Sequence, residues 1–181
     1  MRVFLDFEAS SLAKTSYPIE VAWVFEDGRG EAHLIRPAEG WTDWDAEAEA
    51  IHHIPREALV RDGTPHDVVA ARMIDTLGGH DLFASAPSWD GKWLSVLLRA
   101  AKRPRHSLRL RDTDEAQREA AAAILREAVP ADRVAPLVEE ARARAGVAER
   151  GTPAHRALAD ARDELARWQR VCAMARTLAA G

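Results

Sequence analysis

The first eight residues constrain the fold most, because they combine the pattern of a buried strand with two acids. Residues Arg2 to Glu8 read Arg-Val-Phe-Leu-Asp-Phe-Glu. As a strand they divide into two faces, Val3, Leu5 and Phe7 against Phe4, Asp6 and Glu8. Apolar side chains on both faces are typical of a central strand, whereas buried carboxylates are costly unless paired or bound to metal. Acids at a strand end before a turn are also common, so this segment alone leaves a structural role open.

Length and composition describe an ordinary globular protein. The 181 residues, 47% hydrophobic and 30% charged, favour a single domain over residues 1–181. The chain has no apolar run of about 18 residues and no signal-peptide pattern, so we expect no membrane span. A lone cysteine, Cys172, excludes an intrachain disulfide and favours the cytoplasm. The net charge of −4 argues against a broad grip on duplex DNA, but not against a site for a few nucleotides.

Alternating apolar residues predict further strands. Residues Ile19 to Glu26 and Glu31 to Arg36 form a hairpin around Asp27-Gly28, so the chain opens with a three-stranded antiparallel meander. The apolar run Leu82 to Ala86 is suited to a buried parallel strand, and Ser107 to Leu110 predicts a last strand. The pattern predicts an α/β fold.

Three- and four-residue spacing of apolar positions predicts the helices. We expect them over His66 to Leu77, after Ser88-Trp89-Asp90, from Asp112-Thr113 to about Ala128, over Ala131 to Ala145, and along the C-terminal stripe from Leu158 to Leu178. A short helix is expected after Pro55. Residues Glu39 to Glu49 predict an acidic loop or short helix, in which Trp41 and Trp44 have either a structural or a substrate-stacking role.

A third candidate acid, Asp90, lies at the junction between a predicted strand and a predicted helix. Ligand-binding crevices form at the carboxyl ends of strands in open α/β sheets, which favours a functional role. A helix cap, or an acid stabilised by the helix dipole, is the alternative.

The last helix carries His155-Arg-Ala-Leu-Ala-Asp160. Five residues on an ideal helix turn through roughly 500°, which leaves the two side chains about 140° apart. Both can face one cleft only if His155 precedes the helix and Asp160 lies within it. Capping or surface roles remain open for each residue.

Two other polar clusters have alternative explanations. The pair His52-His53 suggests zinc, but adjacent side chains project differently and no cysteine or third histidine lies at ligand spacing. The segment Arg99 to Arg111 holds six basic residues and no acid. It is either a solvated helix end or a contact for a phosphate backbone.

The candidate acids suit one chemistry in particular. Hydrolysis of a phosphodiester needs a nucleophilic water, a base, and a clamp for charge on the attacking and leaving oxygens. Divalent ions such as Mg²⁺ supply the clamp and prefer carboxylate ligands. Asp6 with Glu8, Asp90 and Asp160 can provide that cage. His155 can serve as the base, because histidine as a residue type exchanges protons near neutral pH.

The three segments Asp6-Phe-Glu8, Trp89-Asp90 and His155 to Asp160 together resemble the signature motifs of the DEDDh family of 3′-to-5′ exonucleases. That family includes ribonuclease T, oligoribonuclease and the polymerase III proofreading subunit. Supporting similarity lies in Ile19 to Ala22, Ile51 to Ile54 and Arg111 to Thr113.

The resemblance implies a ribonuclease H-like fold with a five-stranded mixed sheet. It implies two Mg²⁺ or Mn²⁺ ions held by Asp6, Glu8, Asp90 and Asp160, His155 as general base, and release of 5′-mononucleotides from 3′ ends. The implied substrate contacts are Ala9, Ser10, Ser11, Leu12 as a wedge, and Trp89. Some relatives are homodimers, so a homodimer is possible.

Several positions depart from the family pattern. Ala86 replaces the usual Asn, Trp89 the usual Phe, and His53 the usual Gly, and the turn after Glu8 lacks Thr-Thr-Gly. Because the predicted ligands and base are intact, we expect activity on single-stranded DNA or RNA ends or short oligonucleotides. The alternative is a catalytically silent module with this fold that binds nucleic acid or protein. The sequence does not distinguish DNA from RNA as substrate.

Overall fold

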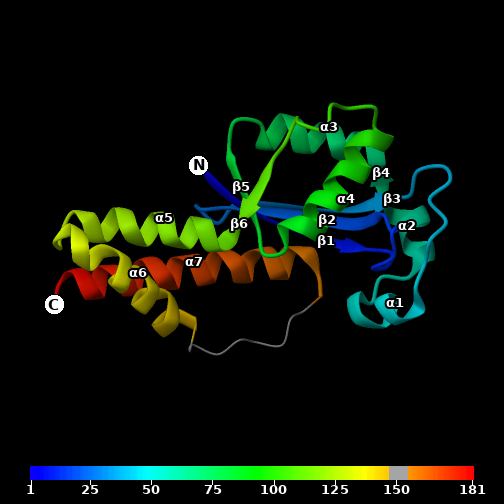
Figure 1. Cartoon of the computed structure of the whole chain (residues 1–181). Helices are drawn as coiled ribbons and strands as arrows, with labels where there is room; N and C mark the ends of the chain where they lie inside the picture. Colours follow the sequence, from blue (N-terminus) through cyan, green and yellow to red (C-terminus); the bar gives the residue numbers. More distant parts are fainter. Residues whose placement is uncertain (147–154) are drawn as a thin grey trace.

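The computed structural model describes residues 1–146 and 155–181, and its centre is one mixed β-sheet with helices on both faces (Figure 1). Over these residues the sheet has six strands in the order β4-β3-β2-β1-β5-β6. The strands are β1 Arg2–Ala9, β2 Pro18–Phe25, β3 Gly30–Arg36, β4 Thr64–Pro65, β5 Asp81–Ala84 and β6 Leu110–Asp112. The predicted α/β class and central position of the first strand are confirmed.

The described helices match the predicted order. They are α1 Ala46–His52, α2 Arg56–Asp62, α3 His66–Leu77, α4 Pro87–Ala100, α5 Thr113–Arg126, α6 Ala131–Gly146 and α7 Ala157–Ala179. Asp45 caps α1 by accepting a hydrogen bond from the Glu47 amide, and Asp112 caps α5 in the same way through Asp114. None of the helices in the described part of the chain is long and apolar enough to cross a membrane.

Strand pairing confirms the opening meander. β1 is antiparallel to β2, and β2 is antiparallel to β3, while β5 and β6 continue the sheet parallel to β1. The resemblance implied five strands, but the described sheet has a sixth, β4, which pairs with β3 at the edge of the sheet. This strand has two residues, one of them Pro65, so it is too short to show any periodicity and suits only an edge position.

The last strand starts later than predicted. The expected segment began at Ser107, but the Ser107 amide and hydroxyl both bond the Pro104 carbonyl in a turn. Pairing with β5 therefore begins at Leu110 and ends at Asp112, where the helix cap takes over.

The alternation of β1 divides the core between the two faces of the sheet. Val3, Leu5 and Phe7 pack with apolar residues of α3 and α4 on one face. Phe4 packs on the other face with residues that include Leu165 of α7. Asp6 and Glu8 share the parity of Phe4, so they point toward the face that α7 covers (Figure 1).

Candidate active site

The carboxyl end of β1 meets the first turn of α7 in a cluster of acids. Asp6 and Glu8 come from β1 and Asp160 from α7, and one carboxylate oxygen from each lies within 4.8 Å of the others. All three side chains are partly exposed, so the cluster is open to a ligand. Oxygen ligands converging in this way suit a hard divalent cation.

Asp90 approaches the same cluster from the first turn of α4. Its side chain is buried, with 2% of its surface exposed, and its charge acts on both Asp6 and Glu8. The Oδ2 atom is buried and has no hydrogen-bond partner among the described residues. A buried carboxylate oxygen without a partner is costly, and a bound cation would compensate it. The four predicted acids are therefore brought together from three elements.

Burial raises the pKa values of Asp6, Glu8 and Asp90, and repulsion from neighbouring carboxylates adds to the rise for Asp6 and Glu8. Burial, followed by the charges of Asp90, Glu8 and Asp160, raises the pKa of Asp6 well above its usual value. Burial and then Asp160 raise the pKa of Glu8 to about 8. Burial raises the pKa of Asp90 to about 7, against hydrogen bonds from the backbone of Ala86 and Phe7. Without a cation the cluster resists full ionisation, as expected of a site made for positive charge.

His155 lies directly before α7, as the helical geometry required. Its backbone has φ 49°, in the left-handed region that non-glycine residues rarely adopt, and Arg156 then takes extended geometry as the helix cap. His155 is thus outside the helix while Asp160 is in its first turn. Its role as general base stays a prediction.

Sequence reasoning missed the roles of three residues beside the acids. Glu20 of β2 lies opposite Glu8 in the β1–β2 register, and Arg156 binds Glu20 through two hydrogen bonds. Glu164, one turn after Asp160, also acts on the pKa of Asp6. The sequence predicted the strand that contains Glu20, but which of its residues lies opposite Glu8 depends on the register between β1 and β2.

Three of the predicted substrate contacts are enclosed by the protein. Ala9, Ser10 and Ser11 are buried, and both serine hydroxyls donate to Oδ2 of Asp43, over 2.9 and 2.5 Å. Thr15 donates to the other oxygen of Asp43 over 3.0 Å. The serine side chains therefore hold the turn after β1 in place. A substrate contact by this segment, which the family resemblance implied, stays a prediction, and the buried serine hydroxyls leave it to the backbone.

Leu12 and Trp89 are the exposed members of the predicted substrate set. Leu12 is 69% exposed and Trp89 39% exposed. The ring of Trp89 packs against Trp93, and Lys92 Nζ lies 5.1 Å from its centre. Exposed apolar side chains next to an acid cluster offer surfaces on which a base can stack.

The basic segment Arg99 to Arg111 leads away from the acid cluster, toward the amino ends of the parallel strands. α4 begins beside the acids and runs about 20 Å from Pro87 to Ala100, since each residue adds about 1.5 Å. The loop after it leads to the first residue of β6, at the amino ends of the parallel strands. Arg111 pairs with Glu115 and Glu119. A contact between Arg99 to Arg111 and a phosphate backbone away from the acid cluster stays a prediction.

The histidine pair has a structural explanation, in agreement with the rejection of zinc. Nδ1 of His52 accepts a hydrogen bond from the Ile54 amide, and the ring packs edge-on against Trp44. His53 ends α1 with φ 56°, the left-handed cap conformation that favours glycine. Glycine would adopt this conformation without strain.

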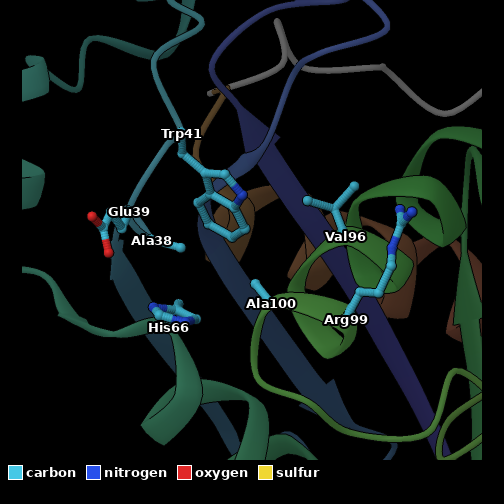
Figure 2. A pocket seen from close by; sticks show the side chains of 7 residues that line it. All are labelled: Ala38, Glu39, Trp41, His66, Val96, Arg99 and Ala100. Atoms are coloured by element: carbon cyan, nitrogen blue, oxygen red, sulfur yellow. The ribbon is translucent and has the colours of Figure 1, made fainter.

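A separate pocket of about 530 Å³ lies between the loop after β3, the start of α3 and the second half of α4 (Figure 2). Trp41 and His66 line one side, and Val96 and Arg99 the other. The ring of Trp41 also stacks on buried Tyr17, which gives it a structural role. None of the four clustered acids lines this pocket.

Comparison with solved structures identifies exonuclease I of E. coli as similar in fold. Its complex with single-stranded DNA and zinc has 17% identity and a TM-score of 0.63, over 91% of this chain and 38% of that one. Its complexes with dT13 and dA16 oligonucleotides have the same identity and TM-score, over 91% of this chain and 39% of theirs. The chain thus spans about two fifths of the length of these neighbours.

No protein-family model matches the sequence. No curated protein matches it either. At 17% identity the structural likeness establishes the fold and leaves the activity open. The chain has the ribonuclease H-like fold that the family resemblance implied, and the solved neighbours named above are structures of an exonuclease.

Proposed function

We propose that this protein is a metal-dependent 3′-to-5′ exonuclease. Its substrates are 3′ ends of single-stranded DNA or RNA, or short oligonucleotides, and its products are 5′-mononucleotides. The observation that carries the proposal is the convergence of four acids from β1, α4 and α7, one of which keeps a buried oxygen without a partner in the described structure. Structural neighbours that are exonucleases support it.

The acids would hold two divalent ions, Mg²⁺ or Mn²⁺. Asp6, Glu8, Asp90 and Asp160 are the ligands. Their oxygen donors, and the raised pKa values of Asp6, Glu8 and Asp90, fit hard cations. When bound, such ions supply a nucleophilic water at neutral pH and stabilise charge on the attacking and leaving oxygens.

The other residues bind and orient the substrate. His155, in its left-handed position before α7, takes the proton of the attacking water as general base. Leu12 wedges against the terminal base, and Trp89 offers an aromatic face to the same nucleotide or its neighbour. Asp43 keeps the turn with Leu12 in place through its bonds to Ser10 and Ser11.

Cleavage of matched DNA and RNA oligonucleotides tests the proposal. Oligomers labelled at the 5′ end should shorten stepwise from the 3′ end with Mg²⁺ or Mn²⁺, release 5′-mononucleotides, and stay intact with EDTA. Asp6→Ala should remain folded and lose turnover, because it removes a ligand. Unchanged turnover in Asp6→Ala rejects Asp6 as a ligand, and ion and nucleotide binding without any cleavage favours the silent binding module. Light scattering tests the predicted homodimer.

A further inference from the structure

Glu20 of β2 and Arg156 at the start of α7, 136 positions apart in sequence, form an ion pair in which the carboxylate is buried and the Arg156 side chain is half exposed. Arg156 Nε donates to Glu20 Oε2 over 3.1 Å, and Arg156 Nη2 donates to Oε1 over 2.7 Å. Glu20 is only 3% exposed. Two parallel hydrogen bonds fix orientation as well as distance, so the pair sets the angle at which the chain enters α7.

The same carboxylate caps the helix. Arg156 is the cap residue of α7 and makes no capping bond with its own side chain. Instead, the Ala157 amide donates to Glu20 Oε2 over 3.0 Å. Ala157 is the first residue of α7, and its amide has no acceptor within the helix, so here a strand of the sheet supplies one. The first turn of α7, which carries Asp160, is thereby tied to β2.

The pair also balances charge within the sheet. Glu8 and Glu20 lie directly opposite each other on β1 and β2, and like charges in such a pair are destabilising. Arg156 lies close enough to act on both carboxylates. Glu8, Glu20 and Arg156 therefore connect the strand that carries Glu8 with the helix that carries Asp160.

We propose that Glu20 and Arg156 are positioning residues, which hold His155 and Asp160 in place against β1 for the metal-dependent cleavage proposed above. This inference rests on the proposed function. Neither residue contacts the substrate in this scheme, and each acts through the first turn of α7. The body of α7 is held separately by the packing of Ala161 and Leu165, so variants of the pair should stay folded.

Arg156→Gln separates positioning from a simple effect of charge. Removing a cation beside Glu8 makes the acid cluster more negative, so charge alone predicts tighter Mn²⁺ binding. Positioning predicts weaker binding, by about ten- to a hundredfold, the usual effect of losing a group that orients a metal ligand. The double variant Glu20→Gln with Arg156→Gln keeps the net charge of the pair at zero. Its affinity for Mn²⁺ should fall as much as that of the single variant Arg156→Gln.

The measurements are Mn²⁺ affinity by calorimetry and oligonucleotide turnover by quenched flow. We expect kcat to fall at least about tenfold in Arg156→Gln while KM changes less than about threefold, because orientation of reacting groups is lost and substrate binding is not. Arg156→Lys keeps the charge and loses the paired geometry, so its kcat and its Mn²⁺ affinity should lie between those of the wild type and Arg156→Gln. Glu31→Gln is the matched control, since Glu31 binds Arg72 in the same two-bond manner away from the acids.

The outcomes separate this inference from the proposed function. If the wild type cleaves and Arg156→Gln keeps its kcat and Mn²⁺ affinity, or binds Mn²⁺ more tightly, the positioning role is overturned. Equal losses in Glu31→Gln overturn it as well, since they show a global effect. If the wild type cleaves no oligomer but Arg156→Gln weakens Mn²⁺ binding, the proposed function fails and the positioning of the acids stands.

Discussion

The substitution Asp90→Asn in the metal-free protein tests whether the negative charge of buried Asp90 lowers the free energy of unfolding. Asp90 is almost fully buried, and burial raises its pKa from 3.8 to about 7. Because the pKa is higher in the folded state than in the unfolded state, the folded protein binds a proton more tightly. The stability that this provides is present below about pH 4 and is lost as the pH rises to about 7.

The size of the effect follows from the two pKa values. One pKa unit corresponds to about 1.4 kcal/mol, so ionisation of Asp90 costs the metal-free wild type about 4 kcal/mol at pH 8. Asparagine cannot ionise, and its amide oxygen can still accept a backbone hydrogen bond. We expect Asp90→Asn to exceed the wild type by about 4 kcal/mol in free energy of unfolding at pH 8, and by under about 1 kcal/mol at pH 4.

Urea unfolding in EDTA between pH 4 and pH 8, followed by tryptophan fluorescence, measures this difference. Exposed Asp163 on α7 provides the matched control, and Asp163→Asn should show no comparable dependence on pH. With saturating Mn²⁺ the wild type should have the higher free energy of unfolding, because it keeps a metal ligand that Asp90→Asn lacks. A difference between Asp90→Asn and the wild type that stays constant with pH would refute the reasoning.

Three further perturbations have defined outcomes. Mn²⁺ at about 100 times its Kd should stabilise the wild type by about 2.7 kcal/mol in thermal unfolding, and an equal gain in Asp6→Asn would contradict the assignment of that ligand. Asp43→Ala should lose about 2 to 3 kcal/mol of unfolding free energy in urea, because three hydroxyl donors lose a charged acceptor; full stability would show that these bonds do not hold the turn. His53→Gly should gain about 0.5 to 1 kcal/mol, since glycine adopts φ 56° without strain, and a loss of stability would reject strain at this cap.

Elements with a long, clean periodicity were predictable from sequence. The helix over His66–Leu77 has the predicted bounds, and its stripe of Val69, Met73 and Leu77 is buried. Strand β1 has its predicted faces, because a side-chain period of two leaves no other choice once one face is buried. β4 was not predictable, since a two-residue strand forms only where a neighbouring edge is available.

The candidate site was predictable in part. The sequence placed Asp6, Glu8, Asp90 and Asp160 at the ends of elements that should meet, and the structure brings them together. It could not show that Ser10 and Ser11 turn inward, because their acceptor, Asp43, lies more than 30 residues away. Nor could a local charge pattern show that the basic segment leads to the far edge of the sheet.

The amino-acid sequence by itself determined the order of strands and helices, the faces of β1, and the requirement that His155 precede the helix containing Asp160. These follow from periods of 2 and 3.6 residues, which are properties of the local backbone. Only the tertiary structure decided which distant groups meet: Glu20 with Arg156, Asp43 with the turn after β1, and Asp90 with the acids of β1. Such contacts depend on strand register and helix packing, which the whole chain settles through burial of its core.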